Sequence, residues 1–374
     1  MLNKVTAFYE PACLHVVLSF KISDVLQAKP CGMHVSEIGK ISGVDPGKIG
    51  RILRLLASKH CFREVSPDVY ANNRLSLLLL SSNPFYNLAL DYAGENYKWT
   101  SELAETLADP TMGRSSAPEH SAFNRYTGYT CSFFDYLNGA APGGNEYRAR
   151  LGTAMVAWGI ATEGGAVVQD FPWGDLPQNA SVCDVGGGVG TVTMQLAKAY
   201  PELRYKLQDT PKVIQRAQDE IWPEGCPEAI AQNRIQFKAM DFLIEPPIAE
   251  CDIYYLKNVI HDWPDQESIK ILQNIRKAMA PHSRVLIHEY ILQPACTCSR
   301  EESSHSVAPP PLLPNYGVGR IRQYNLDLDM MTGLNSKERT LEDFISLGKA
   351  ADLNFVRLWN VGEMGIVELS PALA

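Results

Sequence analysis

The sequence predicts an α/β protein in which a mostly parallel sheet with crossover helices follows a smaller, mostly helical N-terminal domain. First, a β-branched run leads directly into a glycine-rich turn, S-V-C-D-V-G-G-G-V-G-T at 181–191, as expected of a buried strand beside a ligand. Second, short apolar runs alternate with helical patterns after this turn, which is typical of a parallel sheet. Third, the chain ends with two apolar runs around a glycine turn, which predict an antiparallel hairpin.

Size and composition favour a globular protein of two domains. The chain has 374 residues, of which 45% are hydrophobic and 20% are charged, and this length favours two domains. We place the boundary between domains 1–97 and 98–374. No uninterrupted apolar stretch reaches the roughly 18 residues of a membrane span, and the N-terminus lacks the charged-then-apolar layout of a secretory signal.

The charge and the cysteine content narrow the function classes. A formal net charge of −8 argues against a general nucleic-acid binder. The nine cysteines are scattered and show no paired zinc spacing, which favours reduced thiols in a cytoplasmic protein over a disulfide framework.

The N-terminal domain is predicted to contain a winged-helix module. Two helical patterns meet at Gly43, and Asp45 followed by Pro46 is a typical start of the second helix. Phe62 to Val65 and Val69 to Ala71 then predict a small hairpin. Basic residues on the second helix leave a DNA-binding interpretation open beside that of a solvated or subunit-facing helix. These residues are Lys48, Arg51, Arg54 and Lys59.

The segment 83–171 is predicted to be mostly helical and is rich in aromatic and methionine side chains. Its candidates for lining an apolar pocket are Phe133, Phe134, Tyr136, Met155 and Trp158. Met330 and Met331, which follow L-D-L-D, are further candidates, because soft side chains adapt to flat rings. For each residue, packing in a hydrophobic core is the competing interpretation.

Strand and helix patterns alternate through the second domain. The predicted strands are Val182 to Val185, Arg204 to Gln208, Ile235 to Ala239, Asp252 to Leu256, Arg284 to Tyr290, Phe355 to Val361 and Ile366 to Leu369. The predicted helices include Gly190 to Tyr200, Pro211 to Ile221, Asp265 to Met279 and Leu341 to Ala351. An insertion from Gln293 to Gly319, rich in Pro, Ser and Cys, lacks periodicity and predicts a flexible excursion or lid edge.

The glycine-rich turn predicts a nucleotide-type cofactor site. Glycines after a strand let the backbone approach a ligand, and the following helix points its first N–H groups at it. The dinucleotide fingerprint requires glycine at the sixth position counted from Gly186, where this chain has Thr191. The carboxylate of Asp184 suits a cationic group better than a pyrophosphate. Both residues weaken an NAD interpretation.

Acidic residues recur at the predicted carboxyl ends of the strands, where ligands bind in open α/β sheets. Asp209 comes 23 residues after Gly186 and is placed to accept hydrogen bonds from a ribose diol. Asp241 and Phe242 end the third strand and are placed to hold an adenine amine and cover its ring. The competing interpretation is that such acids cap the next helix.

The segment Y-Y-L-K-N-V-I-H-D-W-P-D places Lys257 and His261 around the end of the fourth strand. Imidazole titrates near neutrality, so His261 is a candidate to accept a proton from a phenol or a similar acid. Glu289 ends the next strand and Glu338 follows in N-S-K-E-R-T. These two carboxylates are expected to fix the tautomer of the ring and to support its positive form.

Together, the segments D-V-G-G-G-V-G, L-K-N-V-I-H-D-W-P-D, V-L-I-H-E-Y and S-K-E-R-T-L-E-D-F resemble the class I S-adenosylmethionine-dependent O-methyltransferases of the caffeic-acid type, in their fungal secondary-metabolite branch. The resemblance covers nearly the whole chain, because this family also has an N-terminal winged-helix dimerisation domain. It implies a homodimer and a Rossmann-like, seven-stranded methyltransferase sheet with an antiparallel last strand. It also implies that 98–170 is a helical part that covers the substrate.

The resemblance further implies roles for individual residues. The implied cofactor-binding residues are Asp184 and Gly186 beside the methionine part, Gly188, Asp209 at the ribose, Asp241 and Phe242 at the adenine, and Lys257 nearby. His261 would be the general base, flanked by Glu289 and Glu338. Asn258 stands where the plant enzymes place a tryptophan against the substrate, so their substrate preferences do not transfer.

The implied reaction is methylation of a hydroxyl, expected to be phenolic, on a small aromatic or polyketide-type metabolite. A phenol ionises at about pH 10, so a neutral His261 would assist the attack while the protein aligns the reactants. No metal is expected, because the carboxylates serve histidine, ribose and adenine. Two alternatives stay open: a methyltransferase-like protein that keeps its cofactor for a pericyclic or dehydration step, and a regulator that binds DNA.

Overall fold

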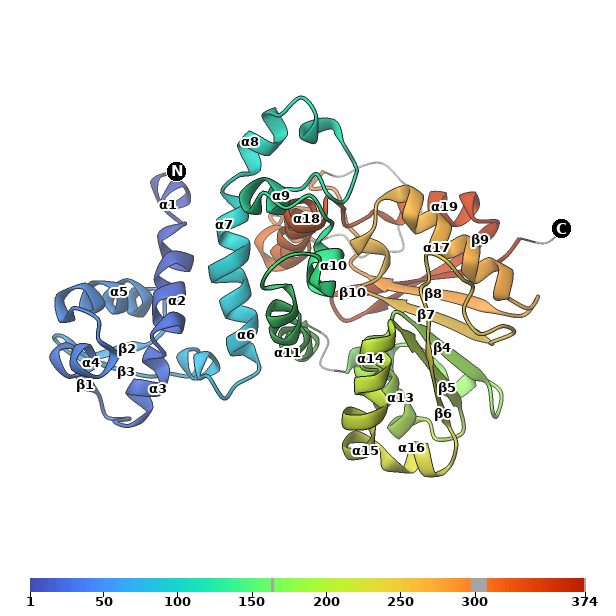
Figure 1. The fold of residues 1–374 in the computed structure, drawn as a ribbon, viewed down its shortest axis with the longest axis horizontal. Coiled ribbons are helices and arrows are strands. Elements are labelled where there is room, and N and C mark those ends of the chain that lie inside the picture. Colours follow the sequence, from blue (N-terminus) through green and yellow to red (C-terminus); the bar gives the residue numbers. More distant parts are fainter. Residues whose placement is uncertain (163–164, 297–307, 373–374) are drawn as a thin grey trace. The chain divides into compact units, whose positions relative to one another are not determined.

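The computed structural model describes residues 1–162, 165–296 and 308–372, and Figure 1 shows the fold. None of the helices in these ranges has the length and the apolar character needed to cross a lipid bilayer.

The chain forms two compact units, Met1–Ser115 with Glu119–Ala161, and Ser116–Pro118 with Thr162–Ala374. This division differs from the boundary that we placed at 97/98, because the helical stretch up to Ala161 groups with the N-terminal unit. The packing explains the difference. Trp158 lies in one apolar cluster with Leu88 and Tyr92, and its ring stacks on that of Tyr92 with centroids 6.2 Å apart.

The first unit contains the predicted helix pair and hairpin. Helix α4 (Val35–Ser42) ends at Gly43, and helix α5 (Pro46–Ser58) begins where Asp45 Oδ1 accepts a hydrogen bond from the N–H of Lys48 at 2.9 Å. Three short strands form an antiparallel sheet in the order β1, β3, β2. They are β1 (Met33–His34), β2 (Arg63–Ser66) and β3 (Val69–Ala71), and the helices before them are α1 (Leu2–Val5), α2 (Tyr9–Ser19) and α3 (Ile22–Gln27).

Helix α5 turns its apolar side chains into the core of the first unit. Ile49, Leu53 and Leu56 are fully buried. Two of its basic residues form ion pairs: Arg54 with Asp68 at 2.8 Å and Lys59 with Glu10 at 3.4 Å. Intramolecular partners therefore neutralise half of the basic residues that suggested DNA binding.

The rest of the first unit is helical, as predicted, and two of its turns are π-helical, η2 (Asp91–Asn96) and η4 (Tyr136–Ala140). Aromatic rings pack on one another around Trp99 and Phe123. The remaining helices are η1 (Ser76–Leu79), α6 (Phe85–Leu90), α7 (Tyr97–Thr100), α8 (Leu103–Ala108), η3 (Met112–Arg114), α9 (Ala122–Thr127), α10 (Phe133–Asp135) and α11 (Gly144–Thr162).

The second unit contains a seven-stranded sheet in the order β6-β5-β4-β7-β8-β10-β9. The strands β6, β5, β4, β7 and β8 are parallel to one another, and β10 lies antiparallel between β8 and β9. The predicted sheet with an antiparallel last strand is thus confirmed. Its strands are β4 (Ser181–Val185), β5 (Arg204–Asp209), β6 (Ile235–Ala239), β7 (Ile253–Lys257), β8 (Arg284–Glu289), β9 (Leu353–Val361) and β10 (Met364–Pro371).

Helices cover both faces of this sheet and complete its two hydrophobic cores. Helices α17 (Asp265–Ala278) and α19 (Leu341–Ala350) pack on one face, and α13, α14 and α15 pack on the other (Figure 1). The remaining helical elements are α12 (Ala166–Asp170), η5 (Trp173–Asp175), α13 (Thr191–Ala199), α14 (Pro211–Arg216), η6 (Ala217–Ile221), α15 (Trp222–Gly225), α16 (Pro227–Ala231), η7 (Ile260–Asp262), η8 (Gly317–Arg320) and α18 (Ile321–Leu334).

The strand order reverses next to β4, which positions the site. After β4 the chain adds β5 and β6 on one side, and it then returns to add β7 and β8 on the other side. In open α/β sheets, ligands bind beyond the carboxyl ends of the strands at such a switch point. The turns after β4 and β7 are therefore where a ligand is expected.

The predicted insertion from Gln293 to Gly319 lies partly outside the described residues. In its described part, the Asn315 side-chain N–H donates to the Tyr324 hydroxyl at 2.6 Å, and this hydroxyl donates to the Gln293 carbonyl at 2.6 Å. The two ends of the insertion are thus fastened to helix α18.

Candidate active site

The glycine-rich turn follows β4, whose residue Asp184 is buried. The hydroxyl of Thr193 donates a hydrogen bond to Oδ2 of Asp184, whereas Oδ1 has no hydrogen-bond partner among the described residues. A Cβ atom on Gly188, whose φ is +60°, would meet nothing within 4 Å. An unpaired buried carboxylate oxygen and an open stretch of backbone both fit a ligand with a cationic group.

The electrostatic surroundings of Asp184 also fit such a ligand. Burial, together with the nearby Asp209, raises the pKa of Asp184 to about 6, while Thr193 and Lys257 act in the opposite direction. A carboxylate held in this way is stabilised by a further positive charge.

Asp209 ends β5 and holds the glycine-rich turn. Its Oδ2 accepts a hydrogen bond from the N–H of Gly188 at 2.9 Å, and its Oδ1 accepts one from the N–H of Thr210 at 2.7 Å. The hydroxyl of Thr210 donates to the same Oδ1 at 3.3 Å. Asp209 is thus held at the end of β5, beside the glycine-rich turn.

Asp241 and Phe242 follow β6 and differ in their contacts. Asp241 is exposed, and its Oδ1 accepts a hydrogen bond from the N–H of Leu243 at 2.9 Å. This contact is the local backbone capping that competes with a role in binding adenine. The ring of Phe242 lies edge-to-face with Trp263, with centroids 5.9 Å apart. A Cβ atom on Gly186 would lie 3.2 Å from this ring. Phe242 is thus packed against the glycine-rich turn.

The turn after β7 packs against the same glycines. Asn258 has a left-handed φ of +52°, which turns the chain sharply after Lys257, and its Oδ1 is buried without a hydrogen-bond partner in the part of the chain that the structure describes. A Cβ atom on Gly186 would lie 2.9 Å from the side chain of Val259. The segment that leads to His261 therefore contacts the candidate cofactor turn.

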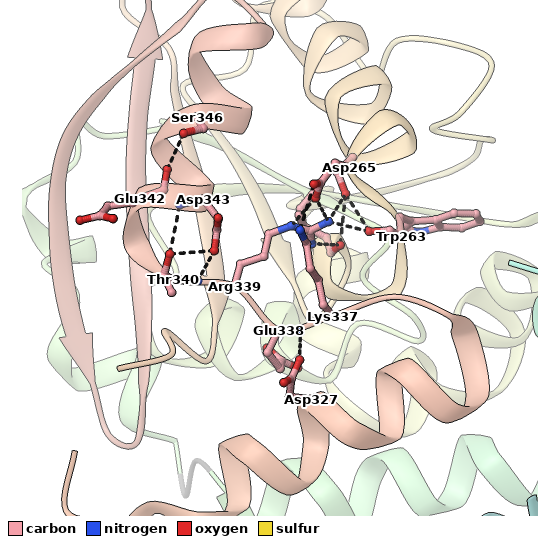
Figure 2. Close-up of polar contacts among 12 residues, drawn as sticks. Trp263, Asp265, Asp327, Lys337, Glu338, Arg339, Thr340, Glu342, Asp343 and Ser346 are labelled. Atoms are coloured by element: carbon pink, nitrogen blue, oxygen red, sulfur yellow. Dashed lines mark hydrogen bonds and ion pairs between the residues drawn. The ribbon is translucent and has the colours of Figure 1, made fainter. Parts of the chain in front are cut away.

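His261 and Glu338 form a buried pair. Nδ1 of His261 lies 2.5 Å from Oε1 of Glu338. The backbone N–H of Glu338 donates to Oδ1 of Asp327 on α18 at 2.9 Å (Figure 2). With the Nδ1 proton assigned to this contact, Nε2 of the neutral ring accepts a proton. The expected carboxylate contact of the ring is thus present for Glu338.

Glu289 has a different contact from the one that the sequence suggested. Its Oε1 accepts hydrogen bonds from the N–H groups of Val259, Ile260 and His261, at 3.1, 2.6 and 3.2 Å. The sharp turn after β7 points three successive N–H groups at this neighbouring strand end, and such a group of N–H donors binds an anion. Glu289 therefore holds the backbone under His261, which corrects the expectation that it fixes the tautomer.

Three carboxylates control the charge of the ring. Burial lowers the pKa of His261, but Glu338, Asp262 and Glu289 outweigh it and raise this pKa to about 10. Asp262 Oδ1 lies 3.4 Å from Nε2 of the ring. Burial raises the pKa of Asp262 to about 6 and that of Glu289 to about 7. The carboxylates thus favour the protonated ring, whereas the sequence suggested a neutral His261 as the acting form.

The candidate substrate residues occur in both units. In the first unit, Phe133 belongs to the aromatic cluster around Trp99, and Trp158 packs with Leu88. Both side chains therefore have the contacts expected of hydrophobic-core residues. Met155 is 48% exposed. In the second unit, Met330 is buried and Met331 is half-buried. Both lie on α18, the helix whose Asp327 contacts Glu338.

Sequence reasoning missed four residues of this site: Asp262, Trp263, Asp327 and Arg339. Asp262 and Trp263 stand in the H-D-W segment directly after the histidine. Asp327 precedes Met330 by three residues, a spacing that places two side chains on one helix face. For Asp262, Trp263 and Asp327, these sequence positions were the signals that could have indicated a place in the site.

Comparisons with known proteins show the family to which this chain belongs. The O-methyltransferase domain family matches residues 157–353, and the O-methyltransferase dimerisation domain matches residues 2–82. The chain is 44% identical to 3-O-methyltransferase 2 of Phanerochaete chrysosporium, over 99% of this chain and 81% of that protein. It is 35% identical to O-methyltransferase gedA of Aspergillus terreus, over 94% of this chain and 78% of that protein.

A solved structure shows the same fold. It is the O-methyltransferase NcsB1 from neocarzinostatin biosynthesis, in complex with S-adenosylmethionine and 2-hydroxy-5-methyl naphthoic acid. It aligns with 99% of this chain and 98% of its own, with a TM-score of 0.75 and 21% identity. On the family matches and the full-length relatives, the chain belongs to the S-adenosylmethionine-dependent O-methyltransferases and carries their dimerisation domain.

Proposed function

We propose that this enzyme methylates a phenolic hydroxyl of a small aromatic or polyketide-type secondary metabolite, with His261 as the general base. The observation that carries the proposal is the buried contact between His261 and Glu338 at 2.5 Å. The turn that bears this histidine packs against the glycine-rich turn through Val259 and Gly186. A group that accepts a proton and the candidate site for the methyl donor are therefore neighbours.

The cofactor-binding residues are proposed from their contacts. S-adenosylmethionine supplies an electrophilic methyl group on its sulfonium sulfur. We assign its cationic methionine part to the unpaired oxygen of Asp184, its ribose to Asp209 and its adenine to Phe242. The remaining proposed cofactor-binding residues are Gly186, Gly188, Asp241 and Lys257.

The proton transfer follows from the surroundings of His261. Nε2 removes the phenolic proton as the oxygen attacks, and the positive ring that results is stabilised by Glu338. A phenol has a pKa of about 10, and the carboxylates raise the pKa of His261 to about 10 as well. The carboxylates thus bring the pKa of the ring closer to that of a phenol, which makes the proton transfer less unfavourable than it is with an ordinary imidazole. Alignment of the two reactants contributes the rest of the acceleration.

The apolar substrate class is supported by the two methionines of α18. We assign Met330, Met331 and Asn258 to the acceptor. Phe133, Met155 and Trp158 of the first unit remain predictions from the sequence. The names of the fungal relatives state O-methylation, which supports a hydroxyl as the acceptor group.

The experiment is incubation of the purified enzyme with methyl-labelled S-adenosylmethionine and a panel of fungal phenols, followed by mass spectrometry. We expect a labelled methyl ether with one phenol class, and His261→Ala should lower its formation by roughly 100-fold or more. The matched control is His282→Ala, because His282 is an exposed histidine that also lies near a carboxylate, with Nε2 3.3 Å from Asp252. Wild-type turnover by His261→Ala would refute the base assignment.

The same experiment separates methylation from a pericyclic or dehydration step. Bound cofactor without release of S-adenosylhomocysteine across the whole panel would favour a non-methylating role. The retained pair of His261 and Glu338 supports methylation over a pericyclic step, because a pericyclic step does not need a base held in this way.

We also propose a homodimer in the cytoplasm. The dimerisation-domain match at residues 2–82 supports the dimer, as does a run of exposed apolar side chains at the N-terminus. These side chains are Leu2, Val5, Phe8 and Tyr9. Free thiols at the cysteines of the described ranges support a reducing compartment.

A further inference from the structure

Arg339 directly follows Glu338 and is fully buried. Its guanidinium brackets the turn of the candidate base: Nη1 donates to the carbonyl of Ile260 at 2.8 Å, and Nη2 donates to the carbonyl of Trp263 at 2.7 Å. These carbonyls belong to the residue before His261 and to the second residue after it. We propose that Arg339 is a positioning residue that fixes this turn, and this inference rests on the proposed role of His261.

A carboxylate completes the contacts of this buried cation. Oδ1 of Asp265 accepts hydrogen bonds from Nε at 3.1 Å and from Nη2 at 2.8 Å (Figure 2). Lys337 donates to the other oxygen of Asp265 at 2.9 Å. A buried charge is costly unless it is paired and hydrogen-bonded, and here the carboxylate and the two carbonyls meet that requirement.

The turn is held from two sides by groups of opposite charge. Glu289 accepts the N–H groups of Val259, Ile260 and His261, while Arg339 donates to the carbonyls of Ile260 and Trp263. The peptide groups around His261 thus have charged partners for both their donors and their acceptors. A ring on such a backbone has little freedom to move away from Glu338.

The backbone of Arg339 ties the same segment to the sheet. Its carbonyl accepts a hydrogen bond from the N–H of Leu292 at 3.0 Å, and it forms an isolated parallel bridge with Ile291. Ile291 follows Glu289 by two residues. Arg339 therefore sets the position of the segments that bear Glu338 and Glu289 relative to the turn that bears His261.

Only arginine meets these demands at this position. Its planar guanidinium carries five donors in a fixed fork, whereas lysine offers one compact ammonium group. A lysine here keeps the positive charge but does not reach two carbonyls and a carboxylate at once. Arg339→Lys therefore separates the positioning contacts from the charge.

The test compares Arg339→Lys with Arg234→Lys. Arg234 is a matched control because it is also buried and donates to a carbonyl, that of Ala197, at 3.0 Å. The first readout is the pKa of the His261 ring in the ligand-free protein, by NMR of histidine-labelled samples with His261→Gln as the assignment reference. Because the charge is unchanged, a weaker contact with Glu338 should lower this pKa by about one unit or more in Arg339→Lys. The control should show the wild-type value.

The second readout is steady-state kinetics with the phenol that the panel identifies. We expect kcat to fall roughly 10- to 100-fold with the KM for S-adenosylmethionine within about twofold of wild type, because a small displacement of the base costs alignment rather than cofactor binding. Asp265→Asn is the second variant, and its effects should be smaller and in the same direction. Wild-type ring pKa and wild-type kcat in folded Arg339→Lys would overturn the inference.

The two readouts distinguish failure of this inference from failure of the proposed function. Full activity of His261→Ala would remove His261 as the base, yet the NMR titration would still show whether Arg339 holds the ring. A reduced melting temperature with unchanged titration and unchanged kcat would assign to Arg339 a role in stability alone and would refute the positioning role.

Discussion

Asp184 gives the sharpest test of the cofactor site, because its ionisation and its contact with the cofactor are linked. Burial raises its pKa to about 6 from an ordinary value of about 3.9, a difference that corresponds to about 3 kcal/mol. The cationic part of S-adenosylmethionine should bind the ionised form. About a tenth of Asp184 is protonated at pH 7 and about nine tenths at pH 5. The Kd for S-adenosylmethionine should therefore rise roughly tenfold as the pH falls from 7 to 5.

The assay is isothermal titration calorimetry of S-adenosylmethionine binding between pH 5 and 7, with wild type, Asp184→Asn and Glu289→Gln. Asparagine keeps an acceptor for Thr193 but loses the charge, so at pH 7 its Kd should be roughly 10- to 100-fold higher. The tenfold pH dependence should also disappear in Asp184→Asn. Glu289→Gln is the control, because Glu289 also titrates near this range, at about pH 7, and this variant should retain the pH dependence since Asp184 is unchanged. A wild-type Kd that is constant from pH 5 to 7 would refute the assignment.

Four further predictions concern the general base, the carboxylate Glu289, the glycine-rich turn and the oligomeric state. The ring of His261 must lose a proton to act as a base, and its pKa is raised to about 10, so kcat/KM should rise about tenfold per pH unit between about pH 7 and 9; a profile that is flat there would contradict the base assignment. Glu289 raises the pKa of His261, so Glu289→Gln should lower the ring pKa in an NMR titration while its remaining oxygen still accepts from the turn, and an unchanged titration would show that its charge does not reach the ring. A Cβ atom on Gly187 would lie 2.4 Å from Asp184 Cγ, so Gly187→Ala should lower the free energy of unfolding in urea by about 1–3 kcal/mol. A Cβ atom on Gly159 would meet nothing within 4 Å, so the control Gly159→Ala should leave this free energy equal or raise it by up to about 1 kcal/mol. An equal loss in both variants would reject the overpacking argument. Light scattering after size exclusion should give twice the chain mass of 41.4 kDa, and a single-chain mass would exclude the dimer.

The sheet was predictable because its signals are local. The run from Val182 to Val185 is buried and ends at the glycines, so strand and turn follow from adjacent residues. The C-terminal hairpin was also read from two apolar runs and a glycine turn, and both strands extend beyond the predicted bounds. The grouping of helix α11 with the N-terminal unit was missed, since an apolar helix face indicates burial but does not identify its partner.

The candidate site was predictable in its residue types and less so in its contacts. Glu289 and Glu338 were both expected beside the ring, because each stands in a segment that reaches the carboxyl end of the sheet. The atoms that Glu289 contacts depend on the left-handed residue Asn258, because the turn there points three N–H groups at Glu289. The contacts of Arg339 were missed for a similar reason, since its partners are main-chain carbonyls and carry no sequence signal.

The charges around His261 bear on which hydroxyl the enzyme accepts. The carboxylates make the ring a stronger base than ordinary imidazole, with a pKa of about 10, and they also keep it mainly protonated at neutral pH. This arrangement suits an acceptor whose pKa is near 10, as for a phenol, because proton transfer is then balanced. An aliphatic hydroxyl has a much higher pKa than a phenol, so its proton would be harder for the ring to remove. These electrostatics therefore support the proposal of a phenolic acceptor over that of an aliphatic one.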